Sequence, residues 1–201
     1  MLESLDLSVL YFCNRNLVNP VFDFLFVSFS NSSVFLWPLV VVIFILLWKG
    51  GTRAILAVIL VIICIAVIDP STHYILKKLF GRLRPCHTLD DLRMIIGCGG
   101  LYGFPSNHAA NSFAAAAVLS LFFRRYTVIF AAMAILISFS RVYLGKHYPT
   151  DVFAGAVWGI AAAFLIVYIT KKILWKLCQD RYLEKYRNEF HGALRWKTGQ
   201  K

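Results

Sequence analysis

Residues 149–175 read PTDVFAGAVWGIAAAFLIVYITKKILW, with no charged side chain between Asp151 and Lys171. An apolar run of this length can cross the hydrocarbon layer of a bilayer, which needs about 20 mostly apolar helical residues. The run lacks the alternation of apolar and polar residues that is typical of a strand in a membrane barrel. It therefore predicts a transmembrane helix and indicates the class of the fold.

Similar apolar segments recur on the N-terminal side of this run. They cover residues 33–48, 53–76, 106–123 and 126–143. Helices are expected in all of them, because an open strand would leave backbone N–H and C=O groups without partners in lipid. The sequence thus predicts an all-α fold, a polytopic membrane helix bundle of about five transmembrane helices in one domain over residues 31–175.

Two of the predicted helices, residues 106–123 and 149–175, are rich in alanine and glycine. The second contains Gly155 and Gly159, which form a GxxxG pair. Small side chains let membrane helices approach closely. We therefore expect these two helices to form the centre of the bundle.

The two ends of the chain differ from this central domain. Residues 1–30 mix leucine and aromatic residues with Asp6, Arg15 and Asp23, which is typical of an interfacial amphipathic segment. Arg15 and Asp23 also argue against a sixth span within this segment. Residues 176–201 are expected to form a basic tail.

The composition agrees with a membrane protein. Hydrophobic residues make up 59% of the 201 residues and charged residues only 15%, whereas soluble domains carry about a quarter charged residues. A net charge of +11 could indicate a nucleic-acid partner. Most basic residues instead flank the apolar runs, so we expect no nucleic acid and take the phospholipid bilayer as the partner.

The distribution of basic residues predicts the orientation in the membrane. Alternating spans place the N-terminus, the loop 79–104 and the turn 144–148 on one side, and the opposite side receives 13 of the 21 Lys and Arg residues. Because cytoplasmic loops carry the excess of Lys and Arg, we expect a cytoplasmic tail. The loop and the turn then face the outside.

Ionisable and polar side chains gather at three helix ends on this outer side, where they are costly unless they have a function. They are Lys77 and Arg84 after the second span, Ser106, Asn107 and His108 at the start of the third, and Arg141, His147 and Asp151 around the turn before the fifth. The economical interpretation is a single cation-rich pocket with two histidines and one carboxylate.

Each cluster also has a simpler interpretation. Lys77 and Arg84 could be anchors whose charged ends reach the interface. Ser106 could cap its helix, and Asp151 could be a first-turn acid favoured by the helix dipole. The joint spacing of the three clusters favours a shared site.

That spacing resembles the tripartite signature of the type 2 phosphatidic acid phosphatase superfamily. The matching residues are Lys77 with six residues before Arg84-Pro85, then Pro105-Ser106-Asn107-His108, then Ser140-Arg141 with five residues before His147 and three more before Asp151. One departure is Asn107, which stands where the family usually has glycine. Its backbone N–H is retained, and we expect its side chain to affect substrate choice.

The resemblance implies a role for each motif residue. His147 attacks phosphorus to form a phosphohistidine, Asp151 orients its ring, and His108 protonates the leaving group and then activates water. The remaining motif residues bind the phosphate through charge and backbone N–H groups. They are Lys77, Arg84, Ser106, Asn107 and Arg141.

No metal and no other cofactor is expected. Only His147 and Asp151 resemble metal ligands, and three cations around them would repel a divalent ion. A channel or transporter would also place cations in the membrane, but it would not need two histidines at this spacing. We therefore predict a metal-independent lipid phosphatase.

The expected substrate is a phosphate monoester or pyrophosphate of a membrane lipid, in the outer leaflet of a bacterial inner membrane. The resemblance favours the phosphate of lipid A, with undecaprenyl pyrophosphate and phosphatidylglycerol phosphate as alternatives. A lipid phosphotransferase would use the same residues. The sequence leaves open the oligomeric state and whether Cys86 and Cys98, which share the outer loop, form a disulfide.

Overall fold

The computed structural model describes residues 2–30, 48, 51–177, 188 and 192. The predicted first span over residues 33–48, apart from Trp48, lies outside the described residues. The same holds for most of the predicted tail over residues 176–201.

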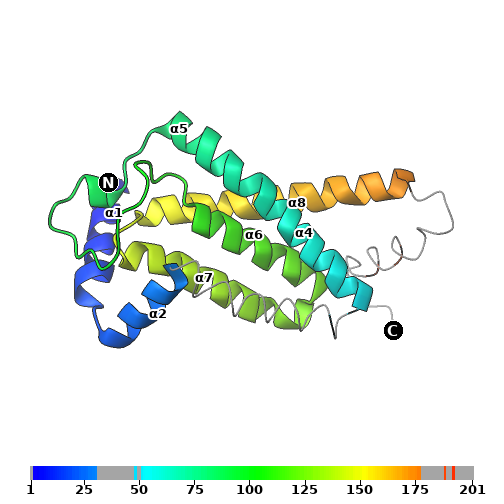
Figure 1. Cartoon of the computed structure of the whole chain (residues 1–201), viewed down its shortest axis with the longest axis horizontal. Coiled ribbons are helices and arrows are strands. Elements are labelled where there is room, and N and C mark those ends of the chain that lie inside the picture. The colour runs from blue at the N-terminus through cyan, green and yellow to red at the C-terminus, as the bar shows by residue number, and fades with distance from the viewer. Residues whose placement is uncertain (1, 31–47, 49–50, 178–187, 189–191, 193–201) are drawn as a thin grey trace.

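The described chain is built from helices (Figure 1). The longer ones are α1 (Leu2–Tyr11), α2 (Pro20–Ser30), α4 (Gly51–Pro70), α6 (Asn107–Phe122), α7 (Thr127–Tyr143) and α8 (Pro149–Leu177). Two π-helical turns, Phe12–Asn16 and Ser71–Leu76, continue α1 and α4, and the short α5 (Lys77–Phe80) follows the second. Within the described residues, the strand-like pairing is an isolated bridge between Leu83 and Tyr102. The predicted all-α class is confirmed.

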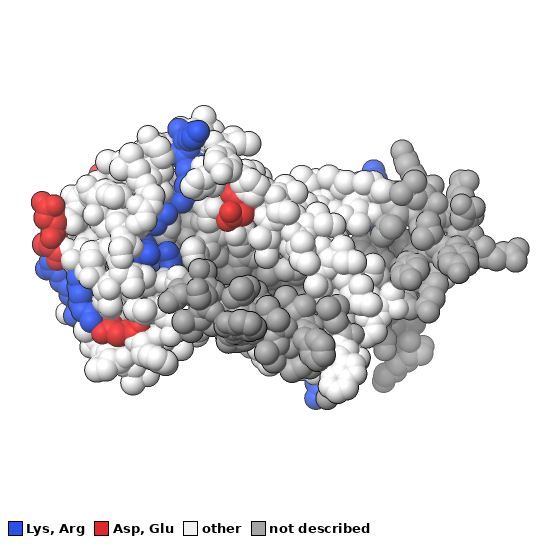
Figure 2. Space-filling model, viewed as in Figure 1, with Lys and Arg blue, Asp and Glu red and all other residues white. Residues whose placement is uncertain are grey.

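Three helical stretches are long and apolar enough to cross a membrane. They are Gly51–Phe80, Arg124–Tyr143 and Pro149–Ile173. They correspond to the predicted spans over residues 53–76, 126–143 and 149–175. The predicted span over residues 106–123 forms the shorter α6, which has 16 residues. Figure 2 shows that most of the charged side chains visible on this face lie at one end of the molecule, at the left of the view.

Helix α6 lies at the centre and packs against α4, α7 and α8 (Figure 1). The approach to α8 is so close that a Cβ atom at Gly159 would lie 2.1 Å from the carbonyl oxygen of Ala110. A Cβ atom at Gly155 would lie 2.4 Å from that of Ser106. The predicted GxxxG contact is therefore real, and it joins the two helices expected at the centre.

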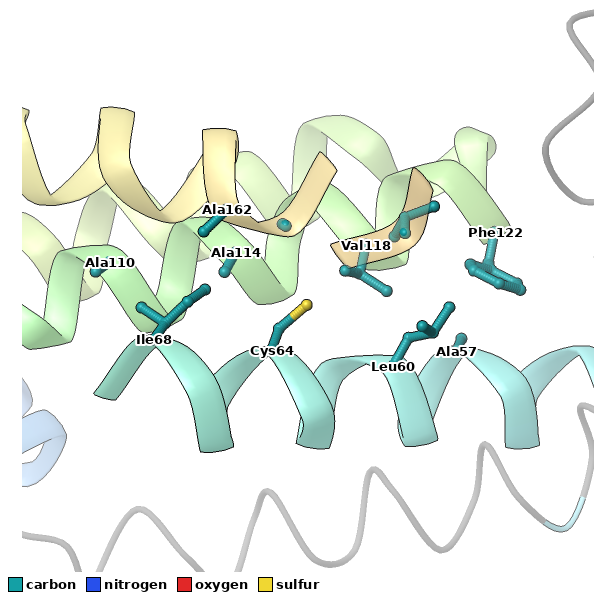
Figure 3. Close-up of a cluster of buried hydrophobic side chains, with 11 residues drawn as sticks. Ala57, Leu60, Cys64, Ile68, Ala110, Ala114, Val118, Phe122 and Ala162 are labelled. Carbon is teal, nitrogen blue, oxygen red and sulfur yellow. The ribbon is translucent and has the colours of Figure 1, made fainter. Parts of the chain in front are cut away.

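A buried apolar cluster locks α4 onto this pair (Figure 3). Residues spaced three or four apart on α4 face α6, as one side of a helix should. They are Ala57, Leu60, Cys64 and Ile68, and they meet Ala110, Ala114, Val118 and Phe122 of α6 and Ala162, Ala163 and Val167 of α8. This packing fixes where the end of α4, and the loop after it, lie relative to α6 and α8.

The N-terminal segment caps one end of the bundle. Helix α1 lies across that end beside the loop that follows α5 (Figure 1). Asn14 ties the segment down, because its amide donates to the carbonyl of Tyr143 at 2.8 Å and its Oδ1 accepts from the N–H of Arg93 at 2.9 Å. Arg93 in turn pairs with Asp23 of α2. The segment predicted as interfacial is thus packed onto the bundle.

The loop between α5 and α6 carries a disulfide. Cys86 and Cys98 are bonded, with their Cα atoms 5.9 Å apart. The pairing that the sequence left open is therefore formed. It closes the loop beside the end of the bundle where the predicted site residues lie.

Candidate active site

His147 and Asp151 form the centre of the site. His147 lies in the turn between α7 and α8 and is 1% exposed, and Asp151 lies one helical turn later and is fully buried. The Nδ1 atom of His147 is 3.4 Å from Oδ2 of Asp151. The same oxygen accepts a hydrogen bond of 3.0 Å from the N–H of Tyr148. The carboxylate therefore lies beside the ring nitrogen that it was predicted to orient, although the two atoms make no hydrogen bond in this structure.

The other oxygen of Asp151 meets a residue that the sequence analysis did not assign. Nη1 of Arg82 donates to Oδ1 of Asp151 at 2.8 Å, and the guanidinium lies 4.2 Å from the ring centre of Tyr148. Nη2 of Arg82 pairs with Asp6 of α1 at 2.7 Å. Arg82 stands inside the first motif, two residues before Arg84, and that position was its only signal in the sequence.

The three predicted cations converge on this pair. Lys77 and Arg141 are buried, and Arg84 is half-buried. Nζ of Lys77 and Nε of Arg84 both donate to the carbonyl of Tyr102, each at 3.2 Å. Lys77 is therefore buried and hydrogen-bonded within the protein, whereas the charged end of an interfacial anchor would reach the membrane surface.

None of these three cations has an acidic partner within ion-pair distance among the described residues. Arg141 donates instead to the hydroxyl of Ser30, and Arg84 to the carbonyl of Cys98. Buried and half-buried cations that make no ion pair with a carboxylate form a strong site for an anion. The arginines add the planar fork that suits phosphate oxygens.

The same environment sets the charge of His147. Burial lowers the pKa of this histidine well below its ordinary value, and Arg84, Lys77, Arg141 and His108 lower it further. The ring is therefore neutral at neutral pH, which a nucleophilic nitrogen requires.

Lys146 adds a cation that the sequence analysis did not single out. Burial, together with the charges of Arg141 and Arg84, lowers the pKa of Lys146 to about 8. That electrostatic coupling indicates that Lys146 belongs to the same positive cluster. Its place directly before His147 in the third motif was the signal in the sequence.

The start of α6 supplies the second motif. Ser106 is fully buried, its N–H donates to the carbonyl of Asp151 at 3.0 Å, and its hydroxyl has no hydrogen-bond partner among the described residues. Ser106 is the N-cap residue of α6, but its side chain makes no capping hydrogen bond, so capping does not account for the buried hydroxyl. His108, two residues further along, is exposed. A free hydroxyl and an exposed imidazole at a helix N-terminus suit an incoming anion.

Asn107 uses its side chain differently from what we expected. Its amide donates to Oδ1 of Asp69 on α4 at 2.9 Å, and Asn111 donates to the same oxygen at 2.8 Å. The side chain therefore joins α6 to α4. What Asn107 offers a phosphate in this arrangement is its backbone N–H.

Metal-ligand geometry is a separate question. In the part of the chain that the structure describes, no group of three or more His, Cys, Asp or Glu side chains is placed to hold a metal ion. His147 and Asp151 face Arg82, Lys77 and Arg84 instead of further carboxylates.

The sequence matches a known family. Residues 50–175 fit the model of the PAP2 superfamily. The chain is 34% identical over 190 residues to a lipid A 4'-phosphatase of Bacteroides thetaiotaomicron, which covers 89% of this chain and 83% of that protein. It is 38% identical over 112 residues to a lipid A 1-phosphatase of Rhizobium etli, which covers 53% of this chain and 48% of that protein.

Solved structures agree with this match. The crystal structure of Aquifex aeolicus LpxE is similar with a TM-score of 0.59 and 29% identity, over 82% of this chain and 95% of that one. A phosphatidylglycerolphosphate phosphatase of Bacillus subtilis shares the fold, with a TM-score of 0.61 and 24% identity over 86% of this chain and 87% of that one. With its motif residues at one end of a membrane helix bundle, this chain belongs to the PAP2 superfamily and is a membrane phosphatase of that type.

Proposed function

We propose that this protein hydrolyses a phosphate monoester or pyrophosphate of a membrane lipid, with the phosphate of lipid A as the favoured substrate. One observation carries the proposal. The buried, neutral His147 lies 3.4 Å from Asp151 and beside Lys77, Arg84 and Arg141, none of which makes an ion pair with an acid among the described residues. This arrangement binds a phosphate next to a nucleophile.

In the first step, Nε2 of His147 attacks phosphorus and the bond from phosphorus to the lipid oxygen breaks. His108 donates a proton to that oxygen as it leaves, and the phosphoryl group stays on His147 as a phosphohistidine. The proton on Nδ1 remains on the ring, on the side of Asp151, whose Oδ2 lies 3.4 Å from the Nδ1 atom. The cations stabilise the charge that builds on the equatorial oxygens.

In the second step, His108 has lost its proton and can accept one from water. The water oxygen attacks phosphorus, the P–N bond to His147 breaks, and inorganic phosphate leaves. His147 returns to its neutral form and His108 to its protonated form. The free hydroxyl of Ser106 and the N–H groups that begin α6 hold the phosphate oxygens through both steps.

The surroundings of the site favour a lipid. The bundle presents exposed apolar side chains along its length, and the region beside the site adds Leu79, Phe80, Met94, Ile95 and Leu101. A lipid can therefore keep its chains in the bilayer while its phosphate reaches the helix ends. The relatives named as lipid A phosphatases, one of them 34% identical, support lipid A as the first substrate to test.

The proposal includes an orientation. The site faces the periplasm or cell exterior of an inner membrane, and residues 176–201 form a cytoplasmic tail. The excess of Lys and Arg on the opposite side and the Cys86–Cys98 disulfide, which suits an oxidising compartment, support it. A membrane-impermeant thiol reagent should label a cysteine introduced at Asp90 in intact cells and spare one at Lys201. The reverse pattern would contradict the orientation.

Phosphate release by the purified protein tests the substrate. We expect the highest kcat/KM for lipid A in mixed micelles, compared with undecaprenyl pyrophosphate and phosphatidylglycerol phosphate. Equal turnover of water-soluble phosphate esters would contradict the lipid proposal. Transfer of the phosphoryl group to a second lipid, without free phosphate, would identify a phosphotransferase.

A further inference from the structure

Asp6 is the most unusual residue of the N-terminal segment. Glu3, Leu5 and Ser8 on the same helix are exposed, whereas Asp6 is only 3% exposed. A buried carboxylate is costly unless its oxygens are bonded. Both oxygens of Asp6 are in fact bonded, and both bonds lead towards the active site.

The first bond joins Asp6 to the start of α8. Its Oδ1 accepts from the N–H of Thr150 at 2.9 Å, and its Oδ2 accepts from the Thr150 hydroxyl. Thr150 directly precedes Asp151, in the first turn of the helix, where backbone N–H groups have no partner within the helix. A side chain from α1 thus caps the helix that carries the catalytic carboxylate.

The second bond joins Asp6 to Arg82. Nη2 of Arg82 donates to Asp6 at 2.7 Å while Nη1 donates to Asp151 at 2.8 Å. The planar guanidinium is therefore held between two buried carboxylates. Without Asp6, Nη2 of Arg82 would lose its acidic partner, and the guanidinium would be held through Nη1, which donates to Asp151 and to the Thr150 hydroxyl at 2.6 Å.

We propose that Asp6 is a positioning residue of the active site and acts on His147 through Arg82 and Asp151. The rotation of the Asp151 carboxylate decides whether its Oδ2 faces Nδ1 of His147. Arg82 holds Oδ1 while the N–H of Tyr148 holds Oδ2, so the two together set that rotation, and Asp6 fixes Arg82. Helix α1 is thus part of the catalytic apparatus. The inference rests on the proposed roles of His147 and Asp151.

A purely structural role for Asp6 is the alternative, and the chain offers a matched control for it. Asp91 pairs with Arg15 at 2.5 Å and also anchors the N-terminal segment. That pair is exposed, and neither of its residues is hydrogen-bonded or ion-paired to Asp151 or Arg82 among the described residues. Asp91→Asn therefore removes an anchor of the same segment and leaves the contacts from Asp6 through Arg82 to Asp151 unchanged.

The experiment compares full-length Asp6→Asn, Asp91→Asn and Arg82→Gln proteins in detergent. Phosphate release is measured with lipid A and also with p-nitrophenyl phosphate. If the wild-type protein hydrolyses only the second compound, the proposed substrate is wrong, and the role of Asp6 can still be tested. Asp6→Asn should lower kcat about tenfold or more and leave KM within about twofold, because a charged hydrogen bond is lost away from the bound phosphate. Asp91→Asn should leave both constants within about twofold.

The double variant Asp6→Asn/Arg82→Gln shows whether Asp6 acts through Arg82 or independently of it. If Asp6 acts through Arg82, adding Asp6→Asn to Arg82→Gln should lower kcat by no more than about twofold. Multiplication of the two single effects would overturn the proposal, as would a wild-type kcat in Asp6→Asn. Should Asp6→Asn fail to fold, Asp6→Glu keeps the charge and moves it by one methylene. Its kcat should lie between those of wild type and Arg82→Gln, and a wild-type value would overturn the proposal.

Discussion

Adding one methyl group at the contact between α6 and α8 should damage both stability and activity. A Cβ atom at Gly159 would lie 2.1 Å from the carbonyl oxygen of Ala110. A carbon atom and a carbonyl oxygen are ordinarily no closer than about 3.3 Å, so α8 must move away by about 1 Å. The obstacle is backbone, which cannot rotate aside as a side chain can.

The expected magnitudes follow from this overlap. Overpacking of a tight contact costs about 1–3 kcal/mol, and each kcal/mol lowers Tm by about 2–4 °C in a chain of this size. Displacement of a catalytic group by about 1 Å can cost about a hundredfold in rate. Gly155→Ala has the smaller overlap, with a Cβ atom 2.4 Å from the oxygen of Ser106. It stands one turn from Asp151, so we expect it to lower kcat more than Gly159→Ala does, and Gly159→Ala to lower Tm more.

The assay is thermal unfolding in detergent together with lipid phosphate release. Gly97→Ala is the control, because a Cβ atom there meets nothing within 4 Å. If Gly159→Ala and Gly155→Ala match this control in both Tm and kcat, the close packing of α6 on α8 does not position the site, and the reasoning is refuted.

Three further predictions concern the chemistry. His147→Ala should abolish turnover and leave the protein folded in detergent, and Asp151→Asn should be less severe because the acid only orients the ring; substantial phosphate release by His147→Ala would remove it from its role. Because the pKa of Lys146 is lowered to about 8, its charge is lost as pH rises through that value. We therefore expect kcat/KM of the wild type to fall there and that of Lys146→Arg to persist to higher pH. Identical pH profiles of the two proteins would contradict this prediction. Activity should persist in excess EDTA and be inhibited by vanadate, and restoration by magnesium or zinc after loss in EDTA would show that the reaction needs a metal.

Much of the fold was predictable because a transmembrane helix is a local property. The length and the apolarity of the run between Asp151 and Lys171 can be read from that segment alone. A helix also pairs its backbone N–H and C=O groups within the same segment. The predicted bounds therefore agree with α6, α7 and α8 to within a few residues. The central place of α6 and α8 was also predictable, since small residues such as Gly159 show where backbones can approach.

The site was predictable only where it follows a spacing along the chain. Lys77, Arg84 and Arg141 stand at fixed distances from recognisable motif partners, so their gathering could be expected. Arg82 and Lys146 lie between those positions and carry no spacing of their own. Their roles depend on which way each side chain points, which the sequence does not specify.

The sequence by itself determined where the helices lie and at which end of the bundle the polar residues meet. Both follow from the composition of each segment and from the 3.6-residue turn of the helix. Tertiary structure decided which distant residues meet there. Asp6 and Arg82 are 76 positions apart, and Asp69 and Asn107 are 38 apart. Such pairs form only after packed helices bring their backbones together, since the cost of burying Asp6 is offset by partners that no local pattern predicts.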